Sequence, residues 1–122
     1  MCNLRGHGLS VNAVALSGDG KTCVSGSGDT TLKLWDLGTG KLLRTLEGHQ
    51  GAVNAVALSG DGKTCVSGSW DKTLKLWDVA SGDRLASYTG DSQFRGVGIT
   101  PDGRYAVAGD ALGRLHKLEI RR

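Results

Sequence analysis

Short β-prone runs separated by glycine-rich turns make up most of this chain. Leu74 and Leu76 alternate with Lys75, which places apolar and polar side chains on opposite faces of a strand. Upstream of that run, residues 60–63 read Gly-Asp-Gly-Lys, the composition of a hairpin turn. The pattern predicts four short antiparallel strands in this stretch and no helix. Their expected positions are residues 53–58, 64–67, 73–77 and 84–88.

An internal repeat organises the chain. Residues 10–37 recur as residues 52–79 and are identical at 24 of 28 positions. A third, degenerate copy runs from Phe94, which aligns with Val53, to Leu118, which aligns with Trp77. Repetition at this period predicts that each copy is one supersecondary unit that buries its apolar faces by stacking on its neighbours.

Two dipeptides mark the repeats: Gly6-His7 recurs as Gly48-His49, and Trp35-Asp36 recurs as Trp77-Asp78. Four strands in about 40–45 residues with these marks resemble the WD-repeat family. Residues 113–119 are also similar to the closing repeat of long bacterial WD-repeat arrays, some of which follow a nucleotide-binding signalling domain. The resemblance implies an all-β fold of propeller blades with four antiparallel strands each. Three blades are expected, at approximately residues 6–47, 48–89 and 90–122.

Each of the first two repeats contains the residue types of a hydrolase triad. In WD repeats, however, the matching positions form a structural hydrogen-bond network with a tryptophan indole, and buried polar groups need such partners. The chain has no nucleophile elbow or oxyanion loop. We therefore expect a structural network and no catalytic residue. The network residues are His7, Ser25, Asp29 and Trp35 in the first repeat and His49, Ser67, Asp71 and Trp77 in the second.

The third repeat has lost this set of residues. Asp91, Ala108, Leu112 and Leu118 replace the His, Ser, Asp and Trp. We expect this blade to be held by apolar packing and backbone ladder bonds alone.

Two residues are candidates for binding a partner. Trp70 is expected in a turn on the same rim as the glycine-histidine loop, where it either anchors a partner or lies flat on a neighbouring loop. Arg95 shares its repeated position with Asn12 and Asn54 on the innermost strand. We expect these three residues to line a central channel that contains solvent.

Three blades cannot close a ring, because propellers have about 4–8 blades. We expect closure by oligomerisation, with a homodimer of six blades favoured over a homotrimer of nine. Residues 2–5 resemble the tail of a fourth strand and are expected to complete the last blade of another copy. A second interpretation is that the chain is a piece of a longer array.

Composition narrows the possible functions. The 15 basic and 12 acidic residues are interspersed, so no stripe for nucleic acid is predicted. No apolar stretch approaches the ~18–20 residues that span a membrane. The three cysteines are an odd number, and Cys23 and Cys65 occupy equivalent strands. We expect reduced thiols, a cytoplasmic setting, no metal and no cofactor.

These observations predict a non-catalytic protein-interaction scaffold. Its expected partners are other copies of the chain and an unidentified protein or peptide on the rim. One alternative is a lectin-like binder of small ligands with one pocket per blade, but the counterparts of Trp70 are Gly28 and Ala111, which are not aromatic. Another is an evolutionary or engineered propeller fragment without activity beyond assembly, which would explain the near-identity of the first two repeats.

Overall fold

Three antiparallel β-sheets make up the part of the chain that the structure describes, residues 8–120 of a computed structural model. The first sheet contains β1 (Val11–Leu16), β2 (Thr22–Ser27), β3 (Leu32–Asp36) and β4 (Leu42–Leu46). The second contains β5 (Val53–Leu58), β6 (Thr64–Ser69), β7 (Thr73–Asp78) and β8 (Arg84–Thr89). The third contains β9 (Phe94–Ile99), β10 (Tyr105–Asp110) and β11 (Leu115–Glu119). The all-β fold and the four strands in each of the first two blades are as predicted.

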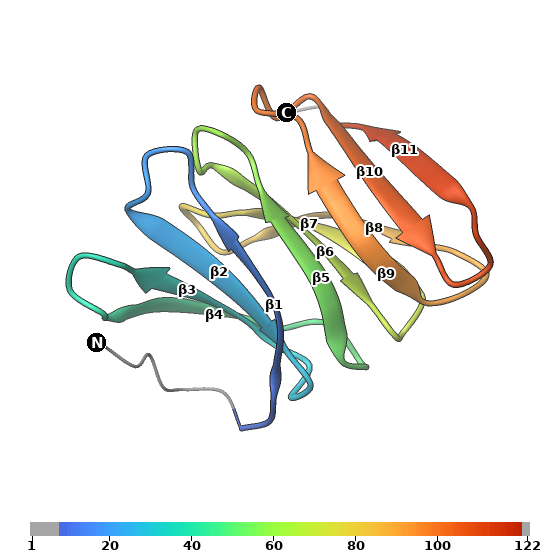
Figure 1. Ribbon diagram of the computed structural model, residues 1–122, viewed down its shortest axis with the longest axis horizontal. Coiled ribbons are helices and arrows are strands. Elements are labelled where there is room, and N and C mark those ends of the chain that lie inside the picture. The colour runs from blue at the N-terminus through green and yellow to red at the C-terminus, as the bar shows by residue number, and fades with distance from the viewer. Residues whose placement is uncertain (1–7, 121–122) are drawn as a thin grey trace.

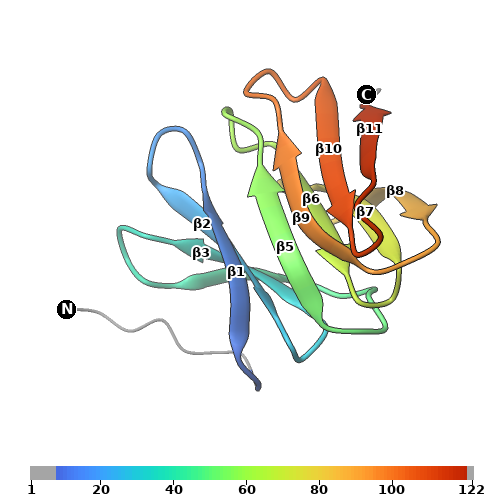
Figure 2. The same cartoon turned by 45° about the vertical axis from the view of Figure 1, so that its right-hand side comes forward.

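Each sheet is a meander in which strands adjacent in sequence pair with one another. The sheets stand side by side, and the inner strands β1, β5 and β9 follow one another across the molecule (Figures 1 and 2). This arrangement places the turn between the second and third strands of every sheet on one rim. On that rim each turn bonds to the segment that enters its own sheet, through Gly28 N–H to Ser10, Trp70 N–H to Ala52 and Ala111 N–H to Gln93.

Apolar side chains fill the space between successive sheets, and this burial is the main source of stability. The core between the first and second sheets contains Val24, Leu32, Leu34, Leu46, Val53, Val56, Cys65 and Trp77. The core between the second and third sheets contains Val66, Leu74, Leu76, Phe94, Ala106 and Ala108.

Gly26 and Gly68 allow the sheets to approach closely. A Cβ atom on Gly26 would lie 2.5 Å from Cγ1 of Val53, and one on Gly68 would lie 3.0 Å from Cβ of Phe94. A side chain from the next inner strand therefore sits over each glycine. At the corresponding Gly109 of β10 this space is open, with no described atom within 4 Å of the Cβ position.

Asparagine side chains bridge the inner strands. Asn12 Nδ2 donates to the carbonyl of Val53, and Asn54 Nδ2 donates to the carbonyl of Phe94, both at 3.1 Å. The sequence placed both asparagines along a channel and did not predict these bonds. Because each bond joins one sheet to the next, the asparagines fix the spacing of the stack.

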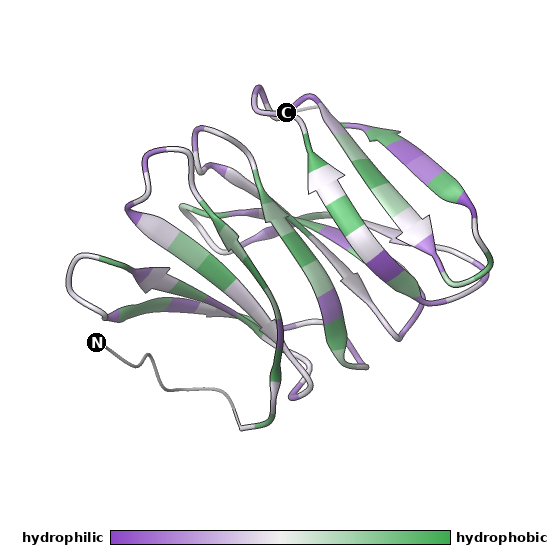
Figure 3. Cartoon of the chain, viewed as in Figure 1, coloured by the Kyte–Doolittle hydropathy of each residue, from purple (hydrophilic) through white to green (hydrophobic). Residues whose placement is uncertain are grey.

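The two outer faces of the stack carry apolar side chains in contact with solvent. Val11, Val14 and Leu16 of β1 are exposed, whereas the identical residues of β5 pack against the first sheet. Val14 is 66% exposed and its counterpart Val56 is 8% exposed. On the third sheet Val107 and Leu115 are exposed (Figure 3 shows the hydropathy of these strands). The same residues are therefore buried on β5, which packs against the first sheet, and exposed on β1, which has no described sheet in front of it.

Among residues 8–120 the structure has no helix long and apolar enough to cross a membrane.

Candidate functional site

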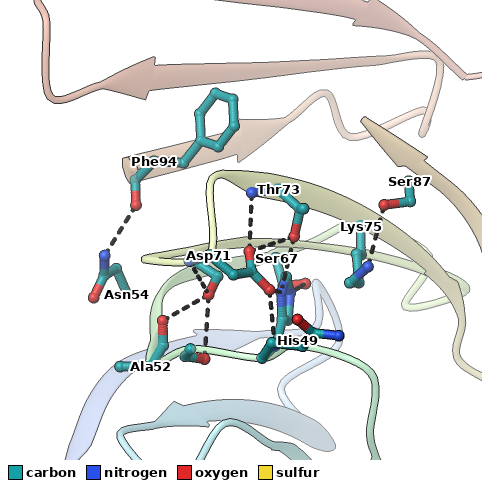
Figure 4. Close-up of polar contacts among 12 residues, drawn as sticks. His49, Ala52, Asn54, Ser67, Asp71, Thr73, Lys75, Ser87 and Phe94 are labelled. Carbon is teal, nitrogen blue, oxygen red and sulfur yellow. Dashed lines mark hydrogen bonds and ion pairs between the residues drawn. The ribbon is translucent and has the colours of Figure 1, made fainter. Parts of the chain in front are cut away.

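A network of four side chains joins the loop before β5 to strands β6 and β7, and Figure 4 shows three of them, His49, Ser67 and Asp71. Nδ1 of His49 lies 3.0 Å from Oδ2 of Asp71, and Nε2 lies 2.7 Å from Oγ of Ser67. The indole Nε1 of Trp77 donates to the same Ser67 oxygen at 2.9 Å. The structure thus brings together all four residues predicted for the second repeat.

The hydrogen bonds of this network run in one direction. An ionised Asp71 carboxylate can only accept, so Nδ1 of His49 carries the proton and donates to it. Nε2 of a neutral His49 then accepts from the Ser67 hydroxyl, whose oxygen accepts from Trp77. Ser67 is fully buried, with 0% of its surface exposed. Its hydroxyl is therefore held inside the stack with its hydrogen-bonding capacity in use.

Charge states within the network follow from burial and hydrogen bonding. Burial lowers the pKa of His49 below its usual value, and the bond to Asp71 offsets only part of this. Burial pushes the pKa of Asp71 upward, but hydrogen bonds from Thr73, the backbone of Gln50 and His49 lower it to about 2. The folded protein therefore favours a neutral imidazole beside an ionised carboxylate.

The first repeat places its described network residues in the same way. Trp35 Nε1 donates to Ser25 Oγ at 2.9 Å, and the backbone N–H of Gly8 donates to Asp29 at 2.9 Å. His7, the fourth residue predicted for this network, lies outside the described residues, as do residues 2–5.

The third sheet contains a polar network of its own, so the prediction of apolar packing and ladder bonds alone is wrong. Oδ1 of Asp110 accepts from the backbone N–H groups of Leu112 and Arg114, at 2.9 and 3.0 Å. Its Oδ2 accepts from Nε2 of His116 at 2.9 Å and from Nε of Arg114 at 3.1 Å. Arg114 also reaches Asp91 at 3.2 Å. The bond from His116, with those from Arg114, holds the pKa of Asp110 well below its usual range.

The repeat alignment explains how Asp110 takes over the part that Asp71 has in the second sheet. In the alignment of the third copy with the second, Asp110 corresponds to Ser69, whose hydroxyl accepts from the backbone N–H of Asp71 at 3.1 Å. Asp110 makes the matching bond to the backbone of Leu112. The carboxylate has therefore moved from the turn to the end of the preceding strand, two residues earlier. An acidic residue at a buried strand end was the signal that the sequence contained.

The two predicted binding residues lie in different places, Trp70 in a rim turn and Arg95 on the inner strand of the third sheet. Trp70 is in the turn between β6 and β7 and is 63% exposed, while its backbone N–H is fixed by the carbonyl of Ala52 at 3.0 Å. Arg95 is the second residue of β9 and is exposed. The indole therefore projects into solvent from a backbone that the Asp71 network holds in place.

The described residues offer little for metal or thiol chemistry. Cys23 and Cys65 are free and buried, and burial raises the pKa of the Cys65 thiol to about 12. Within residues 8–120 no group of three or more His, Cys, Asp or Glu side chains is arranged to hold a metal ion.

Stacked antiparallel meanders, two of them four-stranded and one with a complete His–Ser–Asp–Trp network, define a class of protein: WD-type blades of a β-propeller. The sequence model described as "WD domain, G-beta repeat" matches residues 1–36 and 40–78, more than half of the chain. The chain therefore belongs to the WD-repeat family.

Three similar proteins carry RACK1 names. Small ribosomal subunit protein RACK1z of Oryza sativa subsp. japonica is 56% identical over 46 residues, which is 38% of this chain and 14% of that protein. RACK1y of the same plant is 54% identical over 44 residues, or 36% of this chain and 13% of that protein. Small ribosomal subunit protein RACK1 of Medicago sativa is 48% identical over 50 residues, or 38% and 15%. The chain thus spans 13–15% of the length of these relatives.

Proposed function

We propose that this chain is a non-catalytic protein-interaction scaffold that assembles into a closed propeller and binds a protein or peptide on its rim. The observation that carries the proposal is Trp70, a large aromatic side chain presented to solvent from a turn whose backbone is fixed. Exposed aromatic and arginine side chains on rigid supports are typical anchors of protein interfaces, and Arg95 is an exposed arginine on inner strand β9. Relatives that are named as ribosomal subunit proteins are parts of a larger assembly, which supports binding as the role.

The burial of Ser67 supports the absence of catalysis. A serine nucleophile must reach a substrate carbonyl, but this hydroxyl is enclosed between strands and accepts a hydrogen bond from Trp77. The pairing of His49 with Asp71 is then a structural bond between loop and turn. Buried free thiols at Cys23 and Cys65 fit a reducing, cytoplasmic setting.

The outer faces support self-assembly. The exposed face of β1 has the same residues as the face of β5 that packs over Gly26, and the space over Gly109 on the third sheet is open. Val11 and Val14 of one copy can fill that space in another, as Val53 and Val56 fill the space over Gly26. Two copies make a ring of six blades and three make nine, and the usual range of about 4–8 favours the homodimer.

Light scattering at micromolar concentration tests the assembly. We expect the mass of a dimer for the wild type and of a monomer for Val14→Asp, because a carboxylate on this face would be buried without a partner. Leu112→Asp is the matched control, since Leu112 is 64% exposed but lies on the rim, and it should leave the dimer intact. A wild-type protein that is a stable monomer would refute self-assembly and leave the rim proposal standing.

Affinity capture from cell extract, followed by mass spectrometry, tests the rim. Proteins retained by the wild type should be lost with Trp70→Gly and reduced with Arg95→Ser. Leu85→Ser provides the control, because Leu85 is exposed on the outer strand β8. If all three variants retain the same proteins, the rim is not the binding surface.

A further inference from the structure

An apolar pocket of about 120 Å³ opens between the second and third sheets. Its walls come from β7 and β8 on one side and from β11 on the other. The lining residues are Leu74, Leu76, Ala86, Ser87, Tyr88, Leu118 and Glu119. The rim site does not use this space, and the third-sheet network borders it only through the Tyr88 hydroxyl, which lies 3.4 Å from Nδ1 of His116.

The repeat explains why the pocket exists. Between the first and second sheets the indole of Trp77 packs with Leu32, Leu34 and Leu46. In the third copy the position of Trp77 is taken by Leu118. The smaller side chain leaves part of the indole volume empty. Tyr88, which lines the pocket, is 39% exposed, whereas the corresponding Leu46 is 2% exposed.

In the third sheet, neighbouring side chains fill only one end of the space that corresponds to the Trp77 indole. A Cβ atom on Gly48 would lie 3.3 Å from Cη2 of Trp77, and one on the corresponding Gly90 would lie 2.8 Å from Cζ of Phe94. The ring of Phe94 thus takes the place of the far edge of the indole. The end near Leu118 stays open, with Tyr88 and three leucines around it.

We propose that this pocket binds a small uncharged aromatic molecule, for which indole is the reference ligand. The same position one sheet earlier holds an indole between leucine side chains, so the walls already have the matching shape and polarity. An engineered cavity of ~150 Å³ lined by Leu, Ile and Phe stays dry and binds benzene, which sets the scale for a pocket of this size. The pocket is open at one side, so one of the two fused rings of indole can extend into solvent. The ring of Tyr88 can contact the bound ring edge to face.

Indole binding to the full chain can be measured by NMR titration of methyl-labelled protein. We expect saturable shifts at millimolar indole, centred on the methyl groups of Leu74, Leu76 and Leu118. Urea unfolding followed by circular dichroism gives a second measure. At an indole concentration of ten times Kd, the ratio of folded to unfolded protein should rise about 11-fold.

Two substitutions close the pocket from opposite walls. Leu118→Trp restores the tryptophan of the other repeats, and Ala86→Phe fills the space from an exposed position on β8, where folding tolerates change. Both should abolish the shifts and the stabilisation. Leu85→Phe is the matched control for Ala86→Phe, because it adds the same side chain to β8 at a residue that is 43% exposed and, as the next residue along the strand, points to the opposite face. Its Kd for indole should equal that of the wild type.

Each alternative outcome overturns the proposal. The absence of saturable binding to wild type would show that the pocket takes no free ring. Binding that survives both Leu118→Trp and Ala86→Phe would place the ring elsewhere, on the open faces. Binding that disappears as the protein concentration rises would show that a second copy occupies the pocket. The rim proposal is independent of all three results.

Discussion

Replacement of His49 by alanine isolates what the buried network contributes to stability. The imidazole links Asp71 in the turn to Ser67 on β6, through contacts of 3.0 and 2.7 Å. Alanine removes both links without adding a new polar group. The backbone of the loop keeps one anchor, because the N–H of Gln50 still donates to Asp71 at 2.9 Å.

The expected magnitude follows from the groups left without partners. The Ser67 hydroxyl is fully buried and loses its acceptor, and an unsatisfied buried polar group costs about 1–3 kcal/mol. Asp71 loses one donor but keeps Thr73 and the Gln50 backbone, so its loss is partial. We expect the free energy of unfolding to fall by about 2 kcal/mol.

Urea unfolding at one fixed protein concentration measures this change, since assembly would make stability depend on concentration. The midpoint should fall while the m-value stays constant. Gln50→Ala is the control: it leaves the backbone donor in place and should change stability by no more than about 0.5 kcal/mol. Wild type and variant should both lack esterase activity. Full stability of His49→Ala, together with loss of a measurable esterase activity, would refute the structural interpretation.

Stability should decrease as the pH falls below about 6.5, because burial lowers the pKa of His49 and the unfolded chain takes up the proton first. A second loss below pH 3.8 should come from Asp71 and Asp110 together, because the pKa of each carboxyl group is lowered in the fold. Urea unfolding across this pH range should show both steps, and the first should be absent in His49→Ala. Lys72→Gly should stabilise the protein by about 0.5 kcal/mol in thermal unfolding, because Lys72 has a left-handed φ of 70° where the third repeat has Gly113. A fall in stability would show that the left-handed backbone at Lys72 is not strained. Trp70→Gly should leave the melting temperature nearly unchanged, because the side chain is exposed and the first repeat has glycine there. A large fall would show instead that Trp70 is part of the packing.

The sequence alone was sufficient for the second sheet and its network. Two nearly identical copies, each with glycine-histidine and tryptophan-aspartate marks, define both the length of the unit and the residues that must meet within it. The turn chemistry is also local: Asp61 accepts from the hydroxyl of Ser59 and from the backbone of Lys63 within its own hairpin. Signals of this kind need no knowledge of neighbouring sheets.

The third sheet could not be predicted in the same way, because its network uses different positions. The sequence showed that Leu112 had replaced the turn aspartate, and loss of the network was the expected consequence. Asp110, Arg114 and His116 instead occupy positions that carry Ser69, Thr73 and Lys75 in the second repeat. Asp110 and His116 lie on neighbouring strands, β10 and β11. Their contact can therefore be predicted only when the pairing of these two strands is known. The pocket was missed for a similar reason, because Leu118 leaves a space only in contact with the second sheet.

The two ends of the stack are not equivalent, and this limits how copies can meet. The open face of β1 repeats the residues of an internal face, whereas the outer face of the third sheet carries Lys117 where the first two sheets have Leu34 and Leu76. In the assembly proposed above, contact between two β1 faces would leave both third sheets uncovered, so the contact must join unlike faces. Lys117 can lie in such a contact only if its ammonium group stays in water while its stem covers apolar surface. Its Nζ already lies 4.7 Å from the ring centre of Tyr105, which gives the charge a position at the end of the strand outside the apolar centre. The lysine therefore disfavours deep burial of this face and still permits one head-to-tail contact, the arrangement that closes a ring.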